Sequence, residues 1–273
     1  MLNDEGIGVN LRLSSTVRRA RPEGATSAAV SGTPSLPSGW SRRLYAIIAG
    51  LLAVSLAVRL LAVATDLDFR GLNSLQKWFN VDAEANIPSW FSCVLLFACA
   101  QVMWMLAQRR PGESRRWQLQ QRVLAAVFIY LSIDELTSLH EQIEIPVRNA
   151  FDLTGAFYFA WVVVAVPLVL IFALFMLGYL RALPRVTRRY FVVAGLLYVG
   201  GAAGLEMIGS LLWTSGSGEG SVPYILETIV EEGLEMCSLV LFIGAAHQQL
   251  RHRRAASAPE VTTSEREEAG YGG

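Results

Sequence analysis

Six long apolar segments divide the chain, and they constrain its fold more than any other feature. They cover residues 44–64, 88–107, 119 to beyond 130, 157–180, 190–214 and 225–250. A run of about 20 apolar residues crosses the hydrocarbon core of a bilayer as a helix. Charged residues make up only 17% of the chain, against about 25% in soluble domains. The sequence therefore predicts an all-α, polytopic membrane helix bundle with about six transmembrane helices.

The basic residues alternate between the two sides of such a bundle. Arginine is frequent before the first segment, after the second, after the fourth and after the sixth. The other three loops together hold only Arg70, Lys77 and Arg148. Cytoplasmic loops carry the excess of Lys and Arg in membrane proteins. We therefore expect a multi-pass protein of the cell membrane with an even number of spans and both termini in the cytoplasm.

Two polar ends flank the apolar region. Residues 1–40 and 253–273 lack apolar periodicity, so we expect disordered cytoplasmic tails around a transmembrane domain of residues 41–252. The lipid bilayer is the expected partner. Nucleic acid is not expected as a partner, because the arginines lie in short loops where they act as topology signals. The sequence leaves homo-oligomerisation open.

The loop of residues 65–87 is expected on the outer side. Its segment LNSLQKWF has apolar residues at helical spacing around Trp78 and Phe79. That spacing fits a short interfacial helix and an ordinary loop equally well, and both remain open.

Ionisable residues inside the apolar segments are the main functional indication. Such residues are costly in a bilayer and usually mark a site or a pathway. The third, fifth and sixth segments carry eight carboxyl groups, those of Asp134, Glu135, Glu141, Glu206, Glu227, Glu231, Glu232 and Glu235. At about 1.5 Å per helical residue, all eight fall in the outer half of the bilayer or at its outer surface. The nearby bases are Arg59 and His140, so many of these carboxyl groups must be protonated, face water or hold a cation.

Three functions could account for this cluster. Carboxylates and an imidazole on facing helices are a metal ligand set, which predicts a membrane-embedded metalloenzyme acting on a lipid or another apolar substrate. Chains of carboxyl groups also occur in proton- or cation-coupled transporters of small solutes, although no internal repeat supports a carrier fold here. The third alternative is a non-catalytic membrane scaffold or sensor, held together by protonated carboxyl groups.

The metalloenzyme hypothesis assigns a role to each residue. A divalent iron, zinc or manganese ion would have as ligands Asp134, Glu206, Glu231 and Glu235. His140 or Glu141 would be the acid–base catalyst. On a straight helix with about 100° per residue, His140 lies about 120° from Asp134. We therefore expect these two side chains not to bind the same ion.

Other catalytic chemistry is not indicated. The sequence lacks GxSxG, HExxH, a P-loop and a glycine-rich dinucleotide fingerprint. Cys93, Cys99 and Cys237 have no metal-type spacing, and we expect them to be small buried apolar residues.

Three motifs resemble a recurring pattern: LSIDE with LHE at 131–141, GLEMIG at 204–209 and EEGLEM at 231–236. Together they resemble an uncharacterised group of six-helix bacterial membrane proteins, over about residues 45–250. The resemblance implies a six-helix membrane fold and implies no particular activity. The chain is less similar to the intramembrane CAAX-type proteases, whose arginine after Glu-Glu it lacks, and to the ceramidase-like hydrolases, whose further pair of membrane histidines it lacks.

Overall fold

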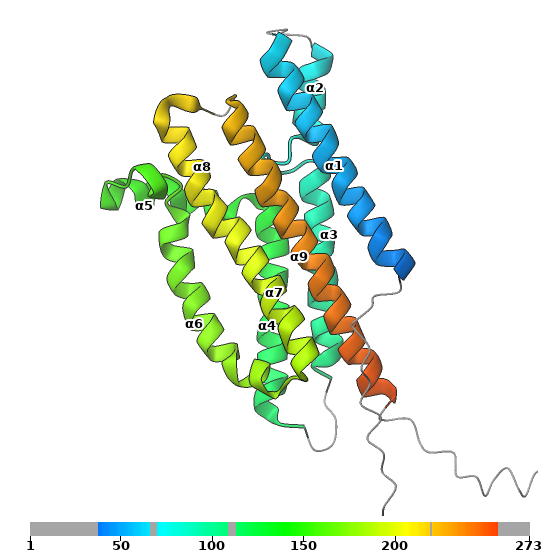
Figure 1. Cartoon of the computed structure of the whole chain (residues 1–273). Coiled ribbons are helices and arrows are strands. Elements are labelled where there is room, and N and C mark those ends of the chain that lie inside the picture. Colours follow the sequence, from blue (N-terminus) through cyan, green and yellow to red (C-terminus); the bar gives the residue numbers. More distant parts are fainter. Residues whose placement is uncertain (1–37, 66–69, 109–112, 219, 256–273) are drawn as a thin grey trace, which may run out of the picture. The chain divides into compact units, whose positions relative to one another are not determined.

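The computed structural model describes residues 38–65, 70–108, 113–218 and 220–255, and every regular element in these ranges is helical. The helices are α1 (Ser38–Thr65), α2 (Arg70–Phe79), α3 (Ile87–Leu106), α4 (Arg115–Thr137), α5 (Leu139–Phe151), α6 (Trp161–Ala182), α7 (Arg185–Val199), α8 (Glu206–Leu212) and α9 (Val222–Ala255). A short 3-10 turn, Gly155–Phe157, precedes α6, and π-helical stretches flank α8 at Gly200–Leu205 and Trp213–Ser217. The predicted all-α bundle is confirmed (Figure 1).

The predicted tails lie almost entirely outside the described residues. Only residues 38–40 and 253–255 of these tails are described, and they belong to α1 and α9. The short segment around Trp78 is helical, because α2 covers it, so the helical alternative is confirmed for its conformation.

Several helices are suited to a membrane. Four in the described ranges are long and apolar enough to cross one: α1, α3, α6 and the rod of residues 185–216, in which α7 and α8 are joined by a π-helical stretch. The bent pair of α4 and α5 makes a fifth if it counts as one span. The sixth predicted span, α9, is 34 residues long but carries four glutamates in its first half. The chain is thus a helical membrane protein, and the count of six spans stays a prediction.

α9 is the central helix of the bundle. It packs against α1, α3, α7 and α8, and its side chains Met236, Val240 and Ala246 are completely buried. In contrast, α6 turns its apolar side chains outward, and Leu168 and Leu174 are 60% and 72% exposed. Outward apolar surface of this extent is expected where lipid is the solvent.

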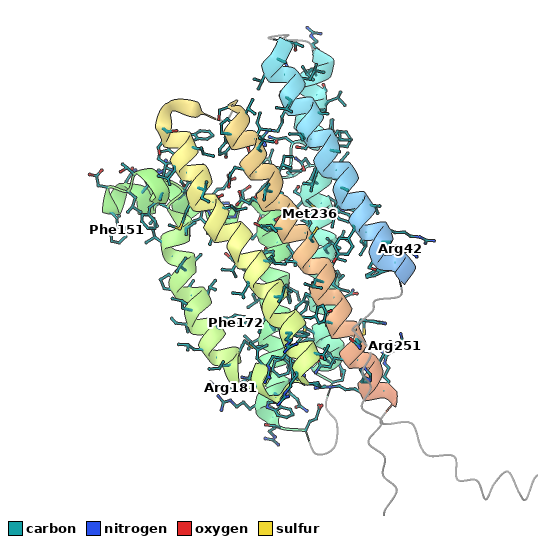
Figure 2. The ribbon with its side chains drawn as sticks, in the orientation of Figure 1. Arg42, Phe151, Phe172, Arg181, Met236 and Arg251 are labelled. Atoms are coloured by element: carbon teal, nitrogen blue, oxygen red, sulfur yellow. The ribbon has the colours of Figure 1, made fainter. Side chains whose placement is uncertain are left out.

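The two ends of the bundle differ in charge. Arg181 and Arg251 lie at the end where α9 finishes and where α6 connects to α7 (Figure 2). Phe151, at the end of α5, lies well away from that end, at about the height of Met236 (Figure 2). The glutamates of α9 belong to its first half, which runs from the opposite end. Which end faces the cytoplasm stays a prediction.

The third apolar segment is not one straight helix, contrary to the expectation from the sequence. α4 and α5 meet at an angle of 80°. Ser138 between them has φ 51° and ψ 43°, a left-handed conformation that ends α4. Its N–H donates to the carbonyl of Asp134 at 2.8 Å, which closes the last turn. Apolar periodicity describes the faces of a helix and says nothing of such a bend.

The rod of α7 and α8 lies very close to α9. A Cβ atom added at Gly201 would be 3.0 Å from Cγ of Glu235 and 3.2 Å from the carbonyl oxygen of Glu231. A Cβ atom added at Gly209 would be 2.9 Å from Oε2 of Glu227. Gly201 lies in the π-helical stretch, a type of irregularity that is frequent at functional sites. Glycine at these two positions therefore lets the backbone of the rod approach the acidic residues of α9.

We expect Gly201→Leu to lower the free energy of unfolding by about 1–3 kcal/mol, because the new side chain would collide with the backbone of α9. Gly200→Leu is the matched control, since nothing lies within 4 Å of a Cβ atom at that position. Thermal unfolding of the detergent-purified variants, followed by circular dichroism, measures the difference. Equal unfolding temperatures would contradict the close approach of the two helices.

Candidate functional site

Asp134 joins the two helices that meet at the break. The residue is only 9% exposed, and its Oδ1 atom accepts the backbone N–H of His140 at 2.9 Å. The first N–H groups of a helix have no partner within the helix, so this bond satisfies one of them at the start of α5. A negative charge is also favourable beside a helix N-terminus. The side chain of Asp134 thereby stabilises the direction in which α5 leaves α4.

The same carboxylate orients the imidazole of His140. Oδ2 of Asp134 lies 3.0 Å from Nδ1 of His140. The ring also packs against Trp161, with the two ring centroids 5.0 Å apart. A histidine whose Nδ1 is held by a carboxylate presents Nε2 to whatever lies in front of it.

Glu84 reaches His140 from a distant part of the chain. It lies in the loop between α2 and α3, and its Oε1 atom is 3.8 Å from Nδ1 of His140. The hydroxyl of Ser138, the residue at the break, donates to the carboxyl of Glu84. Asn86 holds the loop in place, because its amide donates to the carbonyls of Asn80 and Ala83 while its Oδ1 atom caps α3. The loop that carries Glu84 therefore packs against the break between α4 and α5.

Burial changes the acidity of Glu84, which lies outside the apolar helices. Its side chain is 18% exposed, and loss of water raises its pKa to about 7, although the neighbouring His140 opposes the shift. Glu84 therefore keeps its proton to a higher pH than an exposed glutamate does.

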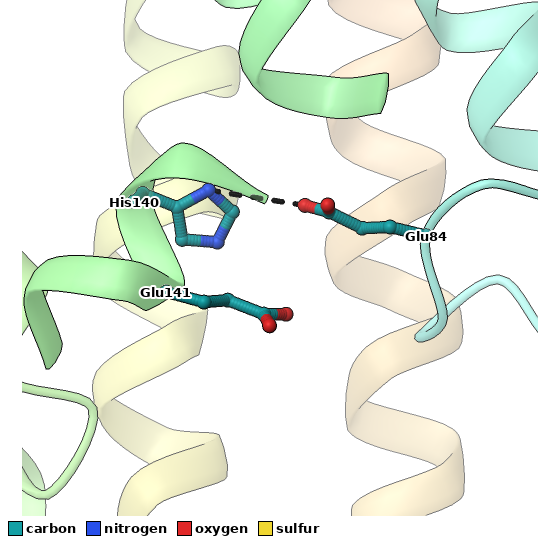
Figure 3. A group of neighbouring side chains, drawn as sticks. All are labelled: Glu84, His140 and Glu141. Atoms are coloured by element: carbon teal, nitrogen blue, oxygen red, sulfur yellow. Dashed lines mark ion pairs between the residues drawn. The ribbon is translucent and has the colours of Figure 1, made fainter. Parts of the chain in front are cut away.

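Glu84, His140 and Glu141 form the group in the described residues that best fits a metal ion. One ligand atom from each lies within 4.8 Å of the other two. Figure 3 shows the three side chains pointing toward a common space, with Glu84 on one side and the two α5 residues on the other. Glu141 is the exposed member of the group. One imidazole nitrogen and two carboxylates are suitable ligands for zinc, iron or manganese.

A second acidic group, of Glu206, Glu227, Glu231 and Glu235, also contacts Trp161. The indole N–H of Trp161 donates to Oε1 of Glu206 at 2.9 Å. The carboxyl of Glu231 is within hydrogen-bonding reach of both Glu206 and Glu227. Glu235 lies one turn further along α9, against Gly201. Trp161 thus touches His140 with its ring and Glu206 with its N–H.

Arg59 fastens α1 to this end of the bundle. The side chain is 5% exposed, and it donates to the hydroxyl of Thr228 at 2.6 Å and to Oδ2 of Asp82 at 3.2 Å. The phenol of Tyr224 donates to the other carboxylate oxygen of Asp82, also at 3.2 Å. Asp82 precedes Glu84 by two residues, so these bonds anchor the loop that carries Glu84.

The predicted site residues fall into two sets. Asp134, His140 and Glu141 lie together around the break, whereas the remaining three predicted residues, Glu206, Glu231 and Glu235, lie along α8 and α9. The argument that Asp134 and His140 lie about 120° apart fails, because it assumed a straight helix and the bend brings their side chains into contact.

Sequence reasoning missed Glu84 and Asp82. Both lie in the loop VDAEAN, which was expected on the outer side and to which no role was given. Two acidic residues on the side of the membrane where the other carboxyl groups gather were the available indication.

We expect Arg59→Met to destabilise the protein by up to about 3 kcal/mol, because it removes the ion pair between Arg59 and the mostly buried Asp82. The double variant Arg59→Met/Asp82→Asn should recover part of this loss. Arg70→Met, at an exposed arginine of α2, is the control. Chemical or thermal unfolding in detergent measures the three variants. An Arg59→Met protein as stable as Arg70→Met would show that the buried pair contributes nothing.

The comparisons with known proteins identify a family and no activity. A family model described as "Domain of unknown function (DUF8692)" matches residues 44–250, which is most of the chain. No curated protein matches, and no solved structure matches. The match covers α1 and α9 in part and all the other helices completely. It includes all the site residues described above. The chain therefore belongs to this family, the domain of unknown function DUF8692.

Proposed function

We propose that this protein is a metal-dependent membrane enzyme whose divalent ion is held by Glu84, His140 and Glu141. The observation that carries the proposal is the convergence of three ligand atoms within 4.8 Å from two segments far apart in sequence. Asp134 on the Nδ1 atom of His140 adds the carboxylate that commonly lies behind a metal-bound histidine. Three protein ligands leave positions open for water and substrate, which is typical of catalytic sites.

In this proposal His140 is a ligand through Nε2, rather than the acid–base catalyst that the sequence suggested. Asp134 supports the imidazole instead of binding the metal. An ion held here would lower the pKa of a bound water and polarise a substrate oxygen. Zinc, iron and manganese all fit one nitrogen and two carboxylate ligands.

The surroundings of the group favour a lipid or another apolar substrate. α5, which carries His140 and Glu141, also exposes Ile145 and Phe151, at 63% and 68%. A helix with ionisable residues and exposed apolar side chains is suited to the interface between membrane and water. If the arginine-rich end is cytoplasmic, the metal group faces the outer interface, where a lipid headgroup would meet it.

A proton- or cation-coupled transporter of a small solute is the second candidate. The contact of Glu206 with Glu231, and of Glu231 with Glu227, favours it, because a continuous series of carboxyl groups can pass protons or cations. Solute flux into liposomes that depends on a pH gradient would distinguish the transporter from an enzyme.

We expect detergent-purified protein, prepared without chelators, to contain close to one equivalent of zinc, iron or manganese by inductively coupled plasma mass spectrometry. Glu84→Gln and His140→Ala should each lose most of this metal, because each removes one of three ligands. Asp152→Asn is the matched control, since Asp152 is exposed at the far end of α5. Native membrane lipids incubated with the metal-loaded protein should then change in mass, and the His140→Ala protein should leave them unchanged.

A metal content in both variants that equals that of the wild type would exclude Glu84 and His140 as ligands. Metal binding without any change in lipids or other apolar compounds would favour the transporter, and the flux measurement would then decide.

Metal affinity should depend on pH through Glu84. The raised pKa of about 7 means that a metal ion must displace a proton from this carboxyl at lower pH. We expect the affinity for Mn²⁺ to fall as the pH is lowered from 8 to 6, by up to about tenfold per pH unit for each proton displaced. Glu84→Gln should bind more weakly and show a shallower dependence. Equal slopes in the wild type and Glu84→Gln would show that Glu84 does not give up its proton to the metal.

A further inference from the structure

Three carboxyl groups follow one another where α8 faces α9, those of Glu206, Glu231 and Glu227. Glu227 and Glu231 are only 9% and 8% exposed. Glu231 lies between the other two members, with its carboxyl in reach of Glu227 on one side and Glu206 on the other. Two ionised carboxylates cannot share such a contact unless a proton or another cation lies between them.

Glu227 shows that this group is incomplete. Both of its carboxylate oxygens are buried, and neither meets a hydrogen-bond donor within the described part of the chain. The carboxyl of Glu231 lies within hydrogen-bonding reach of it, but that group can donate only when it carries a proton. A buried acceptor without a donor is rare in folded proteins, and it calls for an ion, a proton or a water molecule.

The backbone around Glu227 also leaves space for its carboxylate. Gly209 on α8 faces it so closely that a Cβ atom would lie 2.9 Å from Oε2. Arg59 of α1 interacts electrostatically with Glu227, while its hydrogen bonds go to Asp82 and Thr228.

We propose that Glu206, Glu227 and Glu231 bind a hard divalent cation, such as Ca²⁺ or Mn²⁺, at a second site distinct from the Glu84–His140–Glu141 group. The donors are carboxylate oxygens alone, which favours Ca²⁺, Mg²⁺ or Mn²⁺ over metals that prefer nitrogen or sulfur. Glu231, in the middle, would bridge the two outer carboxylates, and Glu206 and Glu227 would turn toward it around the ion. This site stands independently of the proposed enzyme, because it uses none of the same ligands.

The test is a titration of chelator-stripped, full-length protein in detergent with Mn²⁺, followed by the electron paramagnetic resonance signal of the free ion. The wild type should bind two equivalents. His140→Ala should lose one site and keep the other, whereas Glu231→Gln should lose the complementary site. Glu227→Gln should weaken that second site at least about tenfold, because a neutral amide is a poorer ligand than a carboxylate. Ca²⁺ should displace the Mn²⁺ that remains in the His140→Ala protein.

Three outcomes would overturn the proposal. The first is a His140→Ala protein that binds no Mn²⁺. The second is an unchanged second site in both Glu231→Gln and Glu227→Gln. The third is an infrared band of protonated carboxylic acid that persists in saturating Mn²⁺ and disappears in Glu231→Gln. That result would show that the three glutamates share protons and do not bind a cation. Since the first result needs no change on α9, the test does not depend on whether the glutamine variants fold. If the wild type and His140→Ala each bind one equivalent, and Glu231→Gln binds none, the proposed enzyme site is excluded and the second site is supported.

Discussion

The break at Ser138 is the constraint on which the rest of the acidic end depends. A left-handed residue inside a membrane-length segment turns the chain by 80° and frees the backbone groups on either side of it. Asp134 accepts a hydrogen bond from one of these groups, the N–H of His140. Its second oxygen is hydrogen-bonded to the imidazole ring of His140. Ser138 uses its own hydroxyl to hold Glu84. The bend thus provides both the geometry of the candidate metal group and the bonds that keep that geometry in place.

α9 provides the second half of the arrangement. Its later part is a closely packed apolar core helix, with Val240 and Ala246 fully buried, whereas its earlier part carries glutamates toward α8. Glycines in the facing rod make the approach possible. Trp161 contacts one member of each group, His140 with its ring and Glu206 with its N–H. A helix that is apolar at one end and acidic at the other can anchor the bundle and contribute to a site at the same time.

Much of this architecture could be predicted from hydropathy and charge. The all-α class followed from the long apolar segments, and the choice of Asp134, His140 and Glu141 as candidate residues followed from the cost of placing them there. The bend could not be predicted, since serine in a left-handed conformation is unusual and the apolar pattern continues across it. The place of Glu84 beside His140 could not be predicted either, because the position of a loop residue depends on the tertiary contacts of the loop. The error about Asp134 and His140 came directly from treating α4 and α5 as one cylinder.

The order of the residues along the chain has a consequence for biosynthesis. Glu84, Asp134, His140 and Glu141 all belong to the first 151 residues, and α5 ends at Phe151. A ribosome that has released α5 has therefore already delivered every residue of the candidate metal group, while Glu227 and Glu231 emerge only with the last helix. Since chains mature from the N-terminus, the early half can bring its ligands together while α9 is still being made. Insertion of α9 into the centre of the bundle is then the step that seals the core and completes the second acidic group.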